Sequence, residues 1–185
     1  SNPQIYETQL MKSYYWLGRT MLLEEKYREA QEPFMKSLHL ARKLVKAGTE
    51  TSLYLENLYY LSLISANEKD YASAYTYNEE LLPLQNAMYQ KDKKGWKASY
   101  SSQMVSQSFY ANLLGKFKEG EQYSLEAIKV DSTQHMAYTN LAAALLFQGK
   151  VEEAENLYRQ YKAEFKDSFL DDFAEYERLN VIHED

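Results

Sequence analysis

Apolar side chains recur every three or four positions along almost the whole chain, with polar and charged side chains between them. This spacing is typical of amphipathic helices, and the alternation typical of strands is almost absent. Leu, Ala, Glu, Lys and Gln, which favour helices, fill the segments between only 6 glycines and 3 prolines. The pattern predicts helices at residues 6–24, 28–47, 50–67, 71–91, 97–114, 118–130, 134–147, 151–165 and 168–182.

One short motif occurs four times, starting at Glu25, Lys69, Gly115 and Gly149. Each copy has an apolar or aromatic residue two positions later and a small residue three positions beyond that. A second small residue precedes each copy, in the helix before it. The two columns of small residues are Gly18, Ser62, Ser108 and Ala142, and Ala30, Ala74, Gly120 and Ala154.

Small side chains in both helices of a pair let the two helices approach closely. The motif therefore predicts four antiparallel helix pairs, at about residues 11–47, 50–91, 97–134 and 135–167. In the last pair, Gly149 is expected to end the first helix in a conformation that glycine adopts at little cost. Pro83 is expected to kink or split the second helix of its pair, because proline removes a backbone donor.

Two segments depart from this regular pattern. Gln107 stands where a core leucine is expected, and Asn78 and Ser124 replace an aromatic residue, so packing near residues 100–125 is expected to be the least regular. The final segment, 168–182, is predicted to be an amphipathic capping helix. Its apolar stripe consists of Phe169, Leu170, Phe173, Tyr176 and Leu179.

The repeat resembles the tetratricopeptide repeat (TPR), whose 34-residue pattern is W-x2-L-G-x2-Y, then A-x3-F, then P. Residues 11–44 and 135–168 match it best, and the resemblance extends to longer bacterial proteins of the family. It implies an all-α, right-handed α-solenoid of about four repeats plus a C-terminal capping helix, forming a single domain over 1–185. The best-matching residues of the first copy are Tyr14, Leu17, Gly18, Ala30 and Phe34.

Charge and composition exclude several classes of function. The net charge is −6 and no run of basic residues occurs, which argues against nucleic acid as a partner. The longest apolar run, 141–147, is far shorter than the roughly 20 residues that span a membrane. The chain has no cysteine, so its compartment is left open between the cytoplasm and a bacterial cell envelope.

No pattern in the sequence indicates chemistry. His39, His135 and His183 are isolated from one another, so no metal site is expected. No nucleophile elbow or phosphate-binding glycine loop occurs, and neighbouring acids such as Asp171 and Asp172 are expected to be solvated. We therefore predict a protein that is not an enzyme and holds no cofactor.

The TPR resemblance implies that the first helix of each repeat lines a groove for a peptide or protein partner. Aromatic contacts would hold this partner, with Arg19 selecting an acid, and the family's carboxylate clamp is not expected. The aromatic residues have a second interpretation, packing between repeats. The predicted binding residues are Lys12, Tyr15, Trp16, Arg19, Tyr59, Tyr60, Leu63, Val105, Phe109 and Asn140.

Two other hypotheses remain open from the sequence. In the first, exposed repeat ends make the chain self-associate into a homo-oligomer with a structural role. In the second, the chain is an accessory domain of a larger protein, and its aromatic end forms a pocket for a small ligand.

Overall fold

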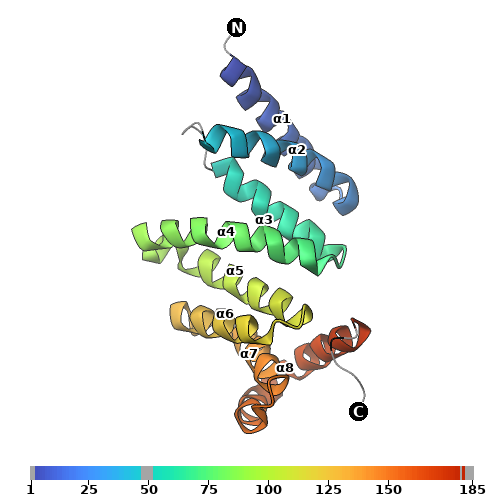
Figure 1. Ribbon diagram of the computed structural model, residues 1–185, viewed down its shortest axis with the longest axis vertical. Helices are drawn as coiled ribbons and strands as arrows, with labels where there is room; N and C mark the ends of the chain where they lie inside the picture. The colour runs from blue at the N-terminus through green and yellow to red at the C-terminus, as the bar shows by residue number, and fades with distance from the viewer. Residues whose placement is uncertain (1–2, 47–51, 180, 182–185) are drawn as a thin grey trace. The chain divides into compact units, whose positions relative to one another are not determined.

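The computed structural model describes residues 3–46, 52–179 and 181, with backbone alone at 162–165 and 167–169. Every regular element in this part of the chain is an α-helix, which confirms the predicted all-α class. The helices, drawn in Figure 1, are α1 (Pro3–Leu23), α2 (Tyr27–Lys46), α3 (Ser52–Asn67), α4 (Tyr71–Lys91), α5 (Lys93–Leu113), α6 (Phe117–Val130), α7 (His135–Leu146) and α8 (Val151–Arg178).

Contacts divide the chain into two compact units, Ser1–Leu84 and Gln85–Asp185. The boundary falls inside α4, one residue after Pro83. The expected splitting of this helix at Pro83 is wrong, since α4 runs as one helix through the proline. Pro83 is exposed, while Leu81 and Leu82 beside it are buried, so packing of the flanking turn offsets the lost hydrogen bond.

The four turns share one backbone conformation. Glu25, Lys69, Gly115 and Gly149 have positive φ angles of 58°, 60°, 70° and 78°. After each of them, the next backbone N–H bonds a carbonyl five residues earlier, as in the 2.9 Å bond from Lys26 to Met21. This is the Schellman arrangement that closes the C-terminus of a helix. The four-fold motif found in the sequence therefore marks four equivalent turns.

The two columns of small residues are buried in all four helix pairs. In the second pair they touch directly, because the Ser62 hydroxyl donates a hydrogen bond of 3.1 Å to the carbonyl of Ala74. In the third, a Cβ on Gly120 would lie 1.9 Å from the side-chain oxygen of Asn112. The expectation that small residues permit close helix pairing is confirmed at these contacts.

The first unit has a continuous apolar core between α1, α2, α3 and the first part of α4. Phe34 and Leu38 of α2 pack against Leu58 and Leu61 of α3, all nearly or fully buried. In Figure 1, α1, α2 and α3 follow one another as neighbouring rods. The amphipathic stripe on α2 thus packs against α1 on one side and α3 on the other.

The second unit has a more polar core than the first. Gln107 and Ser124, where the sequence departs from the repeat pattern, are fully buried. The Asn140 amide of α7 donates to the Val105 carbonyl at 3.0 Å and to the Ser108 hydroxyl at 2.7 Å, both on α5. These hydrogen bonds satisfy polar groups where α5 and α7 meet.

The end of the second unit is covered by the last part of α8. The rings of Tyr158 and Phe173 lie 6.2 Å apart, although a straight helix would separate these residues by about 22 Å. The helix axis must therefore turn back between them, so that α8 has two arms, the second of which ends at Arg178 (Figure 1). Residues 180 and 182 of the predicted capping segment lie outside the described part of the chain. Phe173 and Tyr176 of the second arm pack on Phe147 at the end of α7.

The capping stripe is only partly as expected. Tyr176 is fully buried and Phe173 half-buried, but Leu170 is exposed. The side chain of Phe169 lies outside the described residues. The capping arm therefore buries its C-terminal half more deeply than the residue at its start.

Candidate binding surface

Seven of the ten predicted binding residues lie in the first unit, on α1 and α3. Trp16, Tyr59 and Leu63 are exposed, with 63%, 42% and 37% of their surface open. Tyr60, Arg19 and Lys12 are half-buried, and Tyr15 is buried. Helix periodicity places residues of α1 and α3 on one face, and the structure brings several of them into contact.

The aromatic residues of this face form one connected cluster. Tyr15 meets Trp16 edge-on, with ring centres 5.2 Å apart, and Tyr59 meets Tyr60 in the same way at 5.1 Å. Tyr60 also stacks on the core ring of Phe34 at 5.1 Å. Tyr15 and Tyr60 pack between repeats, whereas Trp16 and Tyr59 face solvent, so contact with a partner stays a prediction for Trp16 and Tyr59.

Polar contacts fix the position of Tyr15 at the centre of the cluster. Its hydroxyl donates a hydrogen bond to the carboxylate of Glu56 on α3. Burial, followed by this hydrogen bond, raises the pKa of Tyr15 to about 12. Arg19 lies beside the same hydroxyl and opposes that rise. Its guanidinium carbon lies 4.6 Å from the centre of the Tyr60 ring, a cation–π contact.

A pocket of about 270 Å³ opens next to this cluster. Three of its residues, Arg19, Tyr60 and Leu63, are among the predicted binding residues. The sequence patterns did not indicate the rest. Tyr27 belongs to the repeated motif at the turn, and Leu22 and Leu23 lie at the end of α1, outside the repeat columns. The lining residues are Arg19, Leu22, Leu23, Tyr27, Tyr60 and Leu63.

The remaining predicted binding residues lie in the second unit. Val105 and Phe109 on α5 are half-buried. Asn140 is almost fully buried and its amide is bonded to α5, so it is not available to a partner. Its assignment to the binding face is corrected here. The reason is that α7 packs on α5 through this side chain, which the helical spacing alone does not reveal.

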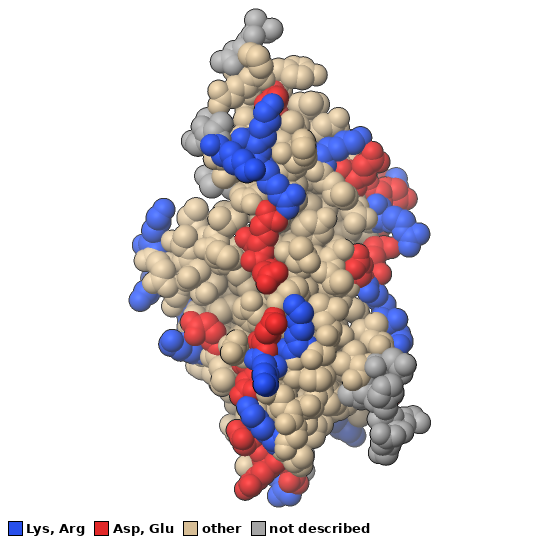
Figure 2. All heavy atoms as spheres, viewed as in Figure 1, with Lys and Arg blue, Asp and Glu red and all other residues tan. Residues whose placement is uncertain are grey.

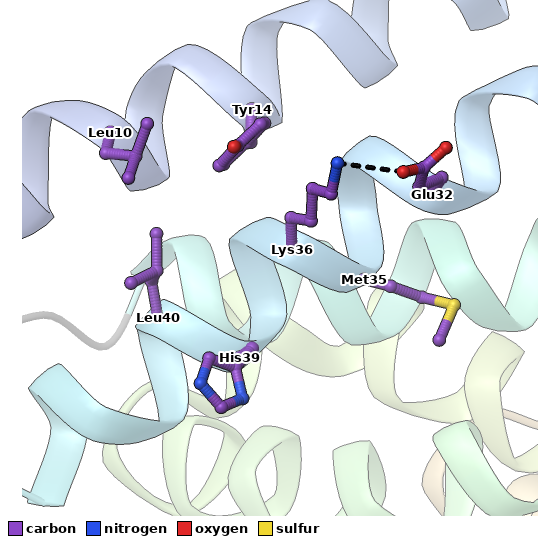
Figure 3. Close-up of a pocket in the computed structure, with 7 residues that line it drawn as sticks. All are labelled: Leu10, Tyr14, Glu32, Met35, Lys36, His39 and Leu40. Atoms are coloured by element: carbon purple, nitrogen blue, oxygen red, sulfur yellow. Dashed lines mark ion pairs between the residues drawn. The ribbon is translucent and has the colours of Figure 1, made fainter.

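A larger hollow of about 480 Å³ lies between α1 and α2, on the side away from α3 (Figure 3). In Figure 3 the side chains of Leu10 and Leu40 point toward each other, and Lys36 pairs with Glu32 at 2.8 Å. The residues drawn there are Leu10, Tyr14, Glu32, Met35, Lys36, His39 and Leu40.

This hollow is the end face of the first repeat. Tyr14 and Leu17 occupy the repeat positions of Leu58 and Leu61, which are fully buried against α2. Tyr14 is half-buried and Leu17 is 46% exposed. Tyr14 matches the repeat pattern, but in the first repeat no described helix covers its column on this side.

Other kinds of site find no support in the described residues. Within 3–46, 52–179 and 181, no group of three or more His, Asp or Glu side chains is placed to hold a metal ion. No helix there is long and apolar enough to span a bilayer. His183 lies outside the described residues. On the face shown in Figure 2, basic and acidic side chains are interspersed, without a broad patch of one sign.

Comparison with solved structures agrees with the repeat geometry. Two crystal structures of a kinesin light chain of Podosopora anserina, described as having nearly identical TPR-like repeats, superpose on this chain with a TM-score of 0.64 each. The sequence identities are 15% and 16%, and each alignment covers 85% of this chain and 76% of the other. This chain has a TPR-like fold. Identities this low establish the fold alone.

The other comparisons add little to this result. A TPR protein of Thermus thermophilus aligns over 93% of this chain and 100% of its own, at 16% identity and a TM-score of 0.39. No family model matches the sequence, and no curated protein matches it.

Proposed function

We propose that this TPR-like protein is a non-catalytic scaffold that binds an extended segment of a partner protein across α1 and α3. The observation that carries the proposal is the exposure of Trp16, Tyr59 and Leu63 on one face, beside the pocket at Arg19 and Tyr60. Large exposed apolar groups gathered in this way mark interaction surfaces. Rigid aromatic side chains supply contact area at a small entropic cost.

A protein segment fits this surface better than a small ligand does. The pocket of about 270 Å³ is open to solvent and smaller than the roughly 300 to 1,000 Å³ of typical ligand sites. Three of its six lining residues are leucines, and the others are Arg19 and two tyrosines, so few polar groups are present to hold a small molecule. A protein segment that continues from the pocket across Trp16 and Tyr59 would also bury the exposed surface of these two side chains.

The proposal is tested by selecting peptides from a random-sequence display library on the immobilised full chain. Binders are expected, and their binding should weaken at least tenfold in a Trp16→Ala, Tyr59→Ala double variant. Tyr6→Ala is the matched control, because Tyr6 is an equally exposed aromatic residue of α1 outside this face. Enrichment of no peptide, or equal binding by the double variant and the control, would reject the proposal.

A second candidate function is self-association through the uncovered end face of the first repeat. The observation that favours it is the apolar hollow at Leu10, Tyr14 and Leu40, with Lys36 and Glu32 on its rim. A two-fold pairing of such faces places opposite charges within reach of each other. Sedimentation across a dilution series should then show a dimer that Leu10→Glu abolishes, because Leu10 lines the hollow. A monomer at all concentrations would eliminate this candidate.

A further inference from the structure

The geometry points to a specific partner chemistry at the α1–α3 face: one large apolar side chain fills the pocket, and a neighbouring Asp or Glu of the same segment pairs with Arg19. This inference rests on the proposed function and specifies what the bound segment must contain. It follows from the lack of an ion pair between Arg19 and any described carboxylate, and from the residues that line the pocket beside Arg19.

Arg19 differs from every other arginine of this protein. Arg28, Arg42, Arg159 and Arg178 each form an ion pair with a glutamate, at 2.5 to 2.8 Å. In the part of the chain that the structure describes, Arg19 forms no ion pair with a carboxylate. These four ion pairs show that an arginine of this protein pairs with a glutamate where one is within reach.

Glu56 of α3 forms no ion pair with Arg19 in the described part of the chain, and its carboxylate accepts the hydrogen bond of the Tyr15 hydroxyl. The Tyr15 hydroxyl beside Arg19 is uncharged at neutral pH, as that of an ordinary tyrosine is, and burial raises its pKa further, to about 12. The positive charge of Arg19 is therefore left for a group supplied from outside.

The contact with Tyr60 holds the Arg19 guanidinium in place for pairing with a carboxylate of the partner. Its carbon lies 4.6 Å from the ring centre, and it also forms a side-chain hydrogen bond with the Tyr15 hydroxyl. A guanidinium carries five N–H donors, so others are left for a ligand. A planar guanidinium matches a carboxylate through two parallel hydrogen bonds. A single arginine favours a carboxylate over a phosphate, since phosphopeptide sites use clusters of arginines.

The wall beside Arg19 selects the apolar neighbour. Leu23 is 80% exposed and Leu63 37% exposed, and with Leu22 and Tyr27 they surround the opening next to the charge. An apolar side chain entering here removes these surfaces from water. Because the pocket holds about 270 Å³, it accepts one side chain, with the partner backbone passing outside.

The test uses the same peptide selection on the full chain, followed by affinity measurements on one selected peptide. We expect selected sequences to place Asp or Glu within a few positions of a large apolar residue. Replacing that acid with its amide should weaken binding to the unaltered protein by about 10- to 100-fold, the loss of one charged hydrogen-bonded pair. This arm needs no protein variant and does not depend on folding.

A protein variant gives the reciprocal measurement. Peptides selected on Arg19→Gln should still contain a large apolar residue but should no longer be enriched in Asp or Glu. Arg28→Gln is the matched control, because Arg28 is a more exposed arginine paired with Glu68 and should leave the selection unchanged. Selected peptides without an acid, or the same acidic peptides bound equally by Arg19→Gln, overturn this inference but leave the proposed function standing. Enrichment of no peptide rejects both.

Discussion

The ring of Phe34 on α2 occupies the space that Gly18 leaves open on α1, so that a Cβ on Gly18 would lie 2.8 Å from two ring carbons. Phe34 is fully buried and also stacks on Tyr60. The ring therefore has little room to retreat. This pair sets how closely the first two helices approach and places the aromatic cluster that leads to the binding face.

Gly18→Ala should destabilise the protein by about 1 to 3 kcal/mol, because overpacking at Phe34 outweighs the gain in helix propensity. Chemical denaturation measures the free energy of unfolding. In a Phe34→Leu background the same change should cost less, since the smaller side chain relieves the clash. An equal cost in both backgrounds would show that the ring is not what restricts position 18.

Glu25→Gly should stabilise the protein by up to about 1 kcal/mol, because Glu25 adopts a φ of 58° that glycine adopts without strain. Lys69→Gly, at the equivalent turn, should act in the same direction. Glu25→Ala is the control, since it removes the charge but keeps the strain. If alanine stabilised as much as glycine, the benefit would come from charge and not from conformation.

Asn140→Ala should destabilise the protein by about 1 to 3 kcal/mol, because it removes the two buried hydrogen bonds that the Asn140 amide donates to the Val105 carbonyl and the Ser108 hydroxyl of α5. Thermal unfolding measures the loss. Ser106→Ala, a less buried change on α5, serves as the control and should have little effect. The set of peptides selected by the folded variant should be unchanged; a changed set would return Asn140 to the binding face.

Stability should fall as pH rises from about 4 to about 7 because of Asp172. Burial, followed by the nearby charge of Asp171, raises the pKa of Asp172 to about 7 from an ordinary value of 3.8. Between these values the folded state holds a proton that the unfolded chain has released. The contribution of Asp172 to the free energy of unfolding is therefore fully present below this range and lost above it.

Asp172→Asn removes this titration while keeping the shape of the protonated acid. The variant should unfold at a higher temperature than the unaltered protein at pH 8, and this difference should shrink steadily as the pH is lowered toward 4. Glu177→Gln, an exposed acid of the same arm, should leave the pH profile unchanged. An unaltered profile in Asp172→Asn would show that other groups cause the dependence.

The helix pairs could be predicted from the sequence because their determinants are local. Gly149 and its counterparts end each first helix through backbone conformation, and the small columns of Gly18 and Ala30 report direct contact within a pair. Such features depend on residues close in sequence, so they survive in any arrangement of the pairs. The four turns, the buried columns of small residues and the capping arm all follow from such local features.

The binding surface depended instead on contacts between pairs. Helical periodicity placed Asn140 and Trp16 on corresponding faces, yet α7 packs on α5 through Asn140, whereas nothing in the described residues covers Trp16. Leu23 and Tyr27 line the pocket only because the end of α1 lies next to α3. Spacing along one helix fixes which side chains share a face. Only the tertiary structure decides whether a neighbouring helix buries that face, because burial depends on the residues that pack against it.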